Sequence, residues 1–347
     1  MQSSLLNVNS DFIQSLVYNE RERLLEWYLR IKRILPWRAA YGTSPNAYHV
    51  LVSEFMLQQT TVQTVIPYFE RFIKRFPTLE SLATAPLDDV YVFWQGLGYY
   101  SRAKNLHCAC QQLYEMGYFP KDVATLKTLS GVGDYTSAAV SAIAFDQPVI
   151  PIDGNVMRVM ARLFMLHQPK GPKLQAETTH YIDVFVGQTN NTYVAQAIME
   201  LGALICKPKK PLCDQCPLAG ECRAFNENVV EQFPKILAKP IKPKRVATTF
   251  VIEDKHGRIL IVKRPAKGLF SNMYIFPTTC FDFDPLLLTQ LTHLKQLQKT
   301  IRHVFSHFDL ELTVVRAQTM HELKGEWVLP NDLGRYGMPT LMHKVLR

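Results

Sequence analysis

Four cysteines constrain the fold of this chain more than any other feature. They are Cys206, Cys213, Cys216 and Cys222, and their spacing is C-x6-C-x2-C-x5-C within seventeen residues. Four thiolates this close in sequence can surround one metal centre, and both tetrahedral zinc and a cubane iron–sulfur cluster accept such a ligand set. The spacing alone does not separate the two. An array this compact is not typical of unrelated buried thiols, so we expect a metal-bound loop.

The charge of the chain favours a polyanionic partner. The formal net charge is +9 at pH 7 and the sequence pI is about 9.1. Lys207, Lys209 and Lys210 lie inside the first loop of the cysteine array. Clustered cations bind phosphates by releasing condensed counterions, whereas evenly spread cations only keep a protein in solution. The charge fits both possibilities, so the motifs have to decide.

Length and composition are typical of a folded protein with two domains. A chain of 347 residues exceeds what one core usually organises, and its 47% hydrophobic and 20% charged residues exclude disorder throughout. It contains no apolar run long enough to span a membrane, and residues 1–11 lack the order of a secretory signal. Seven unevenly spaced cysteines fit a metal site in a reducing compartment better than a disulfide framework. We therefore expect a cytosolic protein without membrane contact.

The apolar pattern divides the chain into four segments. Residues 1–20 form an N-terminal extension to which we assign no function. Residues 21–228 repeat apolar side chains at three- and four-residue spacing and predict an all-helical domain. Residues 229–246 interleave proline and lysine, which is typical of a stiff, extended, basic linker. Residues 247–347 form a second domain.

The second domain is predicted to be α+β. Short β-branched or apolar runs at 247–252, 259–262 and 310–315 predict strands separated by turns. The good helix candidate is the segment 285–297.

A helical domain that ends in this cysteine array resembles the endonuclease III and MutY superfamily of DNA glycosylases. The resemblance runs from about residue 24 to the C-terminus. In that superfamily the four cysteines hold a [4Fe-4S] cluster. The resemblance, and not the spacing, therefore implies one [4Fe-4S] cluster here, together with a helix-hairpin-helix glycosylase fold.

A glycine turn between two helical stretches resembles the DNA-binding hairpin of that superfamily. It consists of Gly131, Val132 and Gly133. A Gly-x-Gly turn that opens a helix leaves backbone amides unpaired, so that a phosphate oxygen can approach the positive end of the helix. Taken alone, such a turn also ends helices for structural reasons. With the resemblance, it implies sequence-independent binding of the DNA backbone.

Two carboxylates lie in segments that match the catalytic segments of the superfamily. Glu54 belongs to S-E-F-M-L-Q-Q-T, where the family glutamate is the general acid. Asp153 follows the hairpin in P-I-D-G-N-V, where the family places its catalytic aspartate, and Asn155 resembles the residue that helps to hold that site. Adenine leaves poorly unless it is protonated, and a desolvated glutamate has the raised pKa that an acid needs. The pair implies the two-carboxylate arrangement of glycoside cleavage, whereas without the resemblance Asp153 reads as an ordinary helix N-cap.

Further matched residues imply base flipping. By the resemblance, Gln59 and Tyr99 enter the duplex near the opposing base, and Trp37 lies near the adenine pocket. Arg38, which follows Trp37 in the matched segment L-P-W-R, is expected to bind DNA. Wedges of this kind offset the unstacking that base flipping requires.

Tyr135 distinguishes between branches of the superfamily. Branches that also nick DNA carry a lysine at this place, which forms a Schiff base with the sugar, and a tyrosine cannot form that imine. The resemblance therefore implies a monofunctional glycosylase. One alternative is a bifunctional endonuclease III-like glycosylase and lyase that acts on oxidised pyrimidines. A second alternative, a non-catalytic DNA-binding or electron-transfer protein, is opposed by the carboxylate pair.

A second-domain segment resembles the Phe-Ser-His loop of the MutY type. It consists of Phe305, Ser306 and His307. That loop belongs to a Nudix-like domain which reads 8-oxoguanine opposite the adenine, whereas the residues alone would suggest a strand with exposed histidines. Gly268 is not followed by the glutamates that bind magnesium in Nudix hydrolases, so we expect recognition without hydrolysis.

The substrate is implied by the same resemblance. The chain would remove adenine mispaired with 8-oxoguanine or guanine from double-stranded DNA, as a step of base excision repair. We expect it to act as a monomer in the cytoplasm, associated with the nucleoid.

Overall fold

The computed structural model describes residues 10–237 and 241–346, and the chain forms two compact units. The first consists of Met1–Gln58 with Met116–Ala238, and the second of Gln59–Glu115 with Lys239–Arg347. Residues 1–9 of the expected N-terminal extension lie outside the described residues. The domain boundaries expected from the sequence stay predictions.

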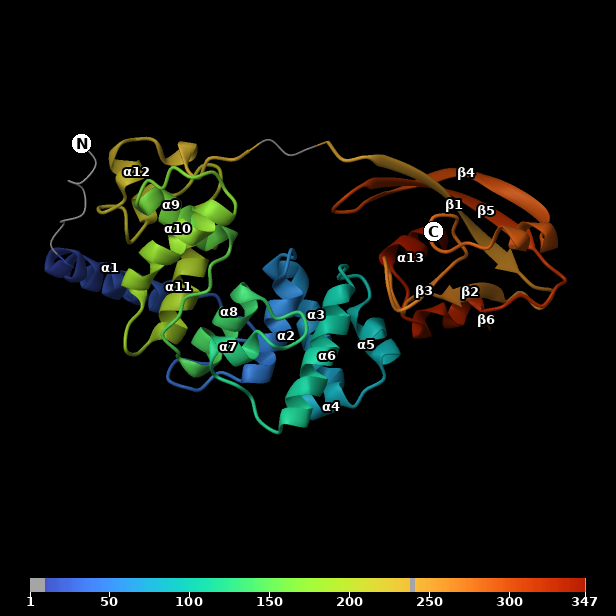
Figure 1. Ribbon diagram of the computed structural model, residues 1–347, viewed down its shortest axis with the longest axis horizontal. Coiled ribbons are helices and arrows are strands. Elements are labelled where there is room, and N and C mark those ends of the chain that lie inside the picture. The colour runs from blue at the N-terminus through green and yellow to red at the C-terminus, as the bar shows by residue number, and fades with distance from the viewer. Residues whose placement is uncertain (1–9, 238–240, 347) are drawn as a thin grey trace. The chain divides into compact units, whose positions relative to one another are not determined.

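The first unit is built from helices (Figure 1). Several start at side-chain caps: Asn46 accepts a hydrogen bond from the His49 amide before α2, and Asp153 accepts two amides before α9. Caps of this kind satisfy N–H groups that have no partner inside the helix. The elements are α1 (Ser10–Ile31), α2 (Ala47–Leu57), α7 (Val123–Leu126), α8 (Asp134–Phe145), α9 (Gly154–Leu163), α10 (Pro172–Ile182), η1 (Asp183–Phe185), α11 (Asn191–Leu204), η2 (Cys213–Gln215), α12 (Arg223–Asn226) and η3 (Val230–Gln232).

One core joins α1, α9, α10 and α11. Val156, Val159 and Leu163, spaced three and four residues apart on α9, are all buried in it. Partly buried Cys206 and Cys216 pack against the same core. The cysteine loop therefore packs against the core that these helices share.

The second unit combines four helices from the middle of the chain with the C-terminal strands and α13. Thr61 caps α3, and Thr78 with Ser81 forms a capping box at the start of α4. Phe72 and Trp94 pack edge to face with ring centroids 5.8 Å apart, which joins α3 to α5. The helices are α3 (Val62–Arg75), α4 (Leu79–Ala83), α5 (Leu87–Trp94) and α6 (Ser101–Met116).

The strands form a mixed sheet in the order β3-β2-β1-β5-β4, with β6 paired to β2. β1 and β5 are parallel, from Lys244 opposite Asp309 to Glu253 opposite Gln318. Apolar side chains of this sheet and of α13 share one core, as expected for an α+β domain. The elements are β1 (Lys244–Glu253), β2 (Ile259–Lys263), β3 (Tyr274–Ile275), η4 (Pro285–Gln290), β4 (Thr292–Val304), β5 (Asp309–Gln318), β6 (Glu326–Val328), η5 (Pro330–Arg335) and α13 (Thr340–Leu346).

The prediction of a helix at 285–297 was wrong. Only a 3-10 helix, η4, occupies its first part, and the remainder belongs to the edge strand β4. β4 pairs with β5 through two register shifts, between Thr292 and Lys295 and between Gln296 and Thr300. Because each irregularity adds residues to the strand, its apolar residues lose the period of two and imitate a helix. The described helix of this region is α13.

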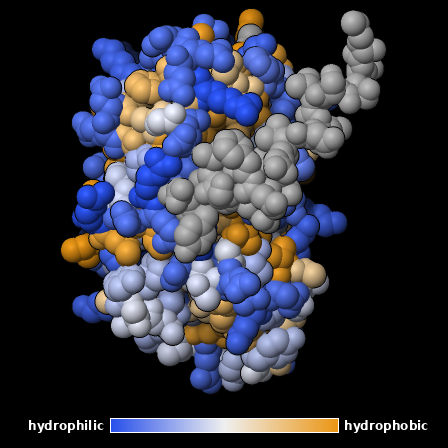
Figure 2. Space-filling model, turned by 90° about the vertical axis from the view of Figure 1, so that its left-hand side faces the viewer, coloured by the Kyte–Doolittle hydropathy of each residue, from blue (hydrophilic) through white to orange (hydrophobic). Residues whose placement is uncertain are grey.

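The face drawn in Figure 2 carries hydrophilic and hydrophobic residues. Hydrophilic residues cover much of the upper part of the face drawn in Figure 2, and hydrophobic residues lie among them in small patches. Apolar side chains scattered in this way are normal on folded proteins. Within the described ranges, no helix has the length and apolar character needed to cross a membrane.

Candidate active site and iron–sulfur site

Glu54 is a buried carboxylate on α2. It is 4% exposed, and among the described residues none donates a hydrogen bond to its Oε2 atom. The pKa of Glu54 is raised to about 7, mainly by burial and also by the nearby charge of Asp153, against the opposing effects of a hydrogen bond with Tyr135 and the charge of Arg38. The site therefore favours a carboxyl that holds its proton near neutral pH.

Tyr135 and Asp153 lie close to Glu54. Tyr135 is the second residue of α8, and Asp153 precedes α9. Desolvation and the charges of the two carboxylates raise the pKa of the Tyr135 hydroxyl well above its usual value. The phenol is therefore a neutral hydrogen-bond donor to Glu54, and the tertiary structure brings together these three residues that the sequence singled out.

The Asp153 carboxylate is held by several hydrogen bonds. Its Oδ1 accepts the amides of Asn155 at 2.8 Å and Val156 at 2.7 Å, and its Oδ2 accepts the Asn155 side-chain amide at 2.8 Å. Asn155 Oδ1 in turn accepts a hydrogen bond from Arg158 at 2.9 Å. Arg158 Nε donates to the carbonyl oxygen of Cys206 at 2.7 Å. A continuous chain of hydrogen bonds therefore links the aspartate to the cysteine loop.

A buried ion cluster lies beside Trp37. Both Arg33 and Arg38 donate to the carboxylate of Glu200, at 2.6 and 3.0 Å, and Glu200 is 1% exposed. Burial raises the pKa of Glu200, but the hydrogen bonds and charges of the two arginines outweigh it and hold the pKa at about 2. Trp37, between the arginines in sequence, is buried. Glu200 thus fixes the Arg38 guanidinium whose charge acts on Glu54.

Sequence reasoning missed Glu200 and Arg158. A signal for Glu200 existed, because it is the one acidic side chain in the largely apolar α11. Arg158 follows Asn155 by three residues on α9 and therefore lies on the same face of that helix.

The glycine turn has the geometry of a hairpin between α7 and α8. Gly131 has φ +72°, a left-handed conformation that favours glycine, and Gly133 is the N-cap of α8 without a side-chain cap. Both glycines are exposed, whereas Val132 is buried and anchors the turn. The first amides of α8 are thus accessible to an anion.

Gln59 and Tyr99 share an uncommon backbone conformation in the second unit. Their φ angles are 56° and 47°, and both side chains are exposed. Arg102, missed by the sequence reasoning, supports both turns: its guanidinium donates to the Gly98 carbonyl at 3.1 Å and to Thr60 Oγ1 at 3.3 Å. It also lies 5.4 Å from the Tyr99 ring centroid. Left-handed non-glycine residues cost free energy and are common at functional sites.

The segment 305–307 forms a tight turn between β4 and β5. The Phe305 amide donates to the Phe308 carbonyl at 2.9 Å, and Ser306 and His307 are exposed at the tip. The two phenylalanine rings stack with centroids 4.7 Å apart.

Cys206, Cys213, Cys216 and Cys222 all line one small cavity of about 30 Å³. Among the described residues, no group of three or more Cys, His, Asp or Glu side chains has the geometry of a site for a single metal ion. Arg162, 2% exposed, also lines the cavity, and its guanidinium lies 3.3 Å from Cys206 Sγ. A buried cation next to four thiolates suits an anionic cluster, whose charge it offsets.

Comparison with known families agrees with this geometry. Residues 52–182 match the HhH-GPD superfamily base excision DNA repair protein, residues 206–222 match the iron-sulfur binding domain of endonuclease III, and residues 248–347 match the NUDIX domain. The four cysteines therefore hold a [4Fe-4S] cluster, and all four lie between the end of α11 and the start of α12. The expected Nudix-like domain is confirmed as well.

Solved structures share the helical fold. A thermostable thymine-DNA glycosylase aligns with a TM-score of 0.54 and 22% identity, over 63% of this chain and 99% of its own. A non-covalent endonuclease III–DNA complex aligns with a TM-score of 0.50 and 22% identity, over 62% and 97%.

Adenine DNA glycosylases match nearly the whole chain. The protein of Buchnera aphidicola subsp. Schizaphis graminum is 33% identical over 95% of this chain and 98% of its own length. Those of Rattus norvegicus and Homo sapiens are 32% and 30% identical, each over 94% of this chain and over 77% and 73% of their own lengths. The chain therefore belongs to the MutY-type adenine DNA glycosylases, the DNA N-glycosylases that remove adenine in base excision repair.

Proposed function

We propose that this glycosylase removes adenine paired with 8-oxoguanine, and more weakly adenine paired with guanine, and leaves an abasic site. The proposal depends above all on one observation, the buried Glu54 carboxyl with a pKa of about 7 beside Tyr135 and Asp153. A group with that pKa is protonated in a substantial fraction of molecules at neutral pH and can deliver its proton to a bound base.

Bond cleavage proceeds by proton transfer and charge stabilisation. Glu54 donates a proton to N7 of the flipped adenine, which makes the base a better leaving group. The electrons of the glycosidic bond leave with the base, and the sugar becomes an oxocarbenium-like cation. The Asp153 carboxylate, fixed by the Asn155 and Val156 amides, stabilises that cation until a water molecule adds to C1′ of the sugar. The Glu54 carboxylate, which the first step left without its proton, accepts the proton that this water releases.

The remaining site residues position the DNA. Gln59 and Tyr99, exposed on left-handed turns, enter the duplex near the opposing base. The amides of the hairpin at Gly131 and Gly133 and the lysines of the cluster loop bind phosphates. Trp37 lies near the pocket of the flipped adenine, and Arg38 belongs to the DNA-binding residues. The monomeric state and the nucleoid location expected from the sequence stay predictions.

A monofunctional mechanism follows from Tyr135. The phenol lies beside the two carboxylates, where an imine with the sugar would require an amine. Wild-type protein should therefore release adenine, and the strand should break only after treatment with alkali. Efficient trapping with borohydride would instead favour the bifunctional alternative.

The second domain reads the base opposite adenine. Adenine is a normal base, so the information must come from the other strand. An 8-oxoguanine differs from guanine by one carbonyl and one N7 proton, which the exposed Ser306 and His307 can recognise through one or two hydrogen bonds. Such bonds contribute about 0.5 to 1.5 kcal/mol each, or roughly a few-fold to tenfold.

The test is single-turnover cleavage of duplexes with adenine opposite 8-oxoguanine, guanine or thymine, at one salt concentration. The wild-type rate should fall in that order. The double variant Ser306→Ala with His307→Ala should narrow the preference for 8-oxoguanine over guanine and retain slow cleavage opposite guanine. An unchanged preference would assign the reading to the helical part of the chain.

A further inference from the structure

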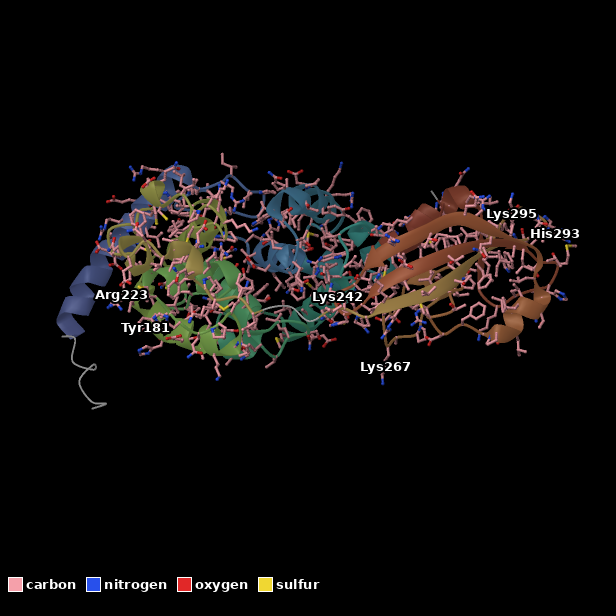
Figure 3. All side chains as sticks on the ribbon, turned by 90° about the horizontal axis from the view of Figure 1, so that it is seen from above. Tyr181, Arg223, Lys242, Lys267, His293 and Lys295 are labelled. Atoms are coloured by element: carbon pink, nitrogen blue, oxygen red, sulfur yellow. The ribbon has the colours of Figure 1, made fainter. Side chains whose placement is uncertain are left out.

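The end of the basic linker contacts the turn at residues 305–308. Lys242 Nζ donates a hydrogen bond to the Phe305 carbonyl oxygen at 2.8 Å. The guanidinium of Arg245 lies 4.3 Å from the centroid of the Phe308 ring. Figure 3 shows Lys242 at one end of the sheet and Lys295 at the other. The chain that enters the second domain therefore passes beside the turn before it continues as β1.

The backbone keeps the linker in this place. The Asp309 amide, directly after the turn, donates to the Pro243 carbonyl oxygen at 3.0 Å. The parallel pairing of β1 with β5 then starts with Lys244 opposite Asp309. The hydrogen bonds between β1 and β5, which begin directly after the turn, therefore also fix the position of Lys242.

The base of the turn is held by the core of the second unit, in which Phe308 is buried and against which Phe305 packs. Besides the bond from the Phe305 amide to the Phe308 carbonyl, aromatic rings hold it from within the unit: His303 and Phe270 lie 4.6 and 5.8 Å from the Phe305 ring, between centroids. From the linker, Lys242 binds the Phe305 carbonyl oxygen and Arg245 contacts the Phe308 ring. A charge-assisted hydrogen bond is stronger than one between neutral groups, and a guanidinium 4.3 Å from a ring centroid is within cation–π distance.

We infer that Lys242 and Arg245 are positioning residues for the turn that reads the opposing base, so that the end of the linker is part of the specificity site. The inference rests on the proposed role of Ser306 and His307. Hydrogen bonds weaken steeply with distance and angle, so a small displacement of the tip reduces the preference for 8-oxoguanine over guanine.

The test compares three variants of the full-length, cluster-loaded protein. Lys242→Met removes the donor and keeps the aliphatic stem, Lys242→Arg restores a donor, and Lys295→Met removes one positive charge at the far end of the sheet. The preference for 8-oxoguanine over guanine opposite adenine should fall roughly three- to tenfold in Lys242→Met, as expected for the loss of one hydrogen bond that is exposed to solvent. It should return with Lys242→Arg and stay unchanged in Lys295→Met.

A second measurement reports on the turn directly. Amide hydrogen exchange in the peptide 303–309 should be faster in Lys242→Met than in Lys295→Met, because the Phe305 amide loses protection. Unchanged exchange would overturn the inference. The inference would also be overturned if Lys242→Met weakened binding to both duplexes equally and lowered the slope of log affinity against log salt concentration by about one. That result is typical of a simple phosphate contact.

The two proposals can fail separately. If Ser306→Ala with His307→Ala leaves the preference unchanged, the turn does not read the base, and the inference falls with the proposed function. If that double variant narrows the preference while Lys242→Met does not, only the role of Lys242 is wrong.

Discussion

At the scale of single residues, burial of Glu54 links catalysis to stability. The pKa of Glu54 is about 7 in the folded protein and has its ordinary value of 4.5 in the unfolded chain, and burial is the main cause of the difference. Between these pH values the unfolded chain has released the proton that the folded chain retains. The free energy of unfolding contributed by this group is therefore fully present below pH 4.5 and is lost as the pH rises to about 7.

Glu54→Gln should separate the two effects. The amide cannot donate a proton as an acid, so single-turnover release of adenine should fall on the order of 10²- to 10⁴-fold while binding of mispaired DNA survives. The melting temperature of the variant minus that of wild type should be larger at pH 8 than at pH 5. At pH 8 the wild-type protein buries a charged carboxylate, whereas the variant buries a neutral amide. Wild-type cleavage should also decline as the pH rises through about 7. A wild-type rate that increases with pH over this range would argue against Glu54 as the acid.

At the scale of structural elements, one arginine on α6 supports both turns that we assign to the duplex. Arg102 bonds to Gly98 and Thr60 and lies beside Tyr99. Arg102→Lys keeps the charge but cannot match several acceptors with a planar fork. The ratio of the affinity for mispaired duplex to the affinity for fully paired duplex should fall about tenfold at a fixed salt concentration, as expected when about 1.4 kcal/mol of binding free energy is lost. The control is Arg71→Lys on α3, where the guanidinium donates to the Phe93 carbonyl on the surface. Equal effects of the two substitutions would rule out a special role for Arg102.

At the scale of the whole molecule, the second unit combines helices from the middle of the chain with the C-terminal strands. Tyr91 is 1% exposed and donates to the Ser271 carbonyl at 3.0 Å. The Tyr100 hydroxyl is bonded to the Thr340 hydroxyl and accepts the Thr340 amide, both at 2.9 Å. A chain that ends at Leu237 loses these partners and exposes both tyrosines.

Truncation should therefore destabilise the helical part and not only remove base recognition. The chain ending at Leu237 should melt at a lower temperature than the intact protein and should be cleaved faster by proteases within residues 59–115. Tyr100→Phe in the intact chain should lower the free energy of unfolding by about 1 to 3 kcal/mol, because the Thr340 amide loses its acceptor. A truncated chain as stable as the intact one would show that these contacts add nothing.

Local patterns determined what the sequence could predict. The cysteine spacing, the glycine turn and the segments around Glu54 and Asp153 are each contiguous, so their residues are neighbours in any fold that forms. Their resemblance to one superfamily predicted the cluster and the helical and Nudix-like parts, which the family matches confirm. The residue roles stay predictions.

Only the tertiary structure decided which distant side chains meet. Glu200 reaches Arg38 across 162 positions, and Lys242 reaches Phe305 across 63, and neither pair has a spacing that periodicity could reveal. The strand β4 was hidden for a related reason, because its register shifts are set by β5 and disturb the alternation that marks a strand. Spacing along the chain determines which residues belong to one element, whereas the packing of one element on another determines the charges and hydrogen bonds of the site.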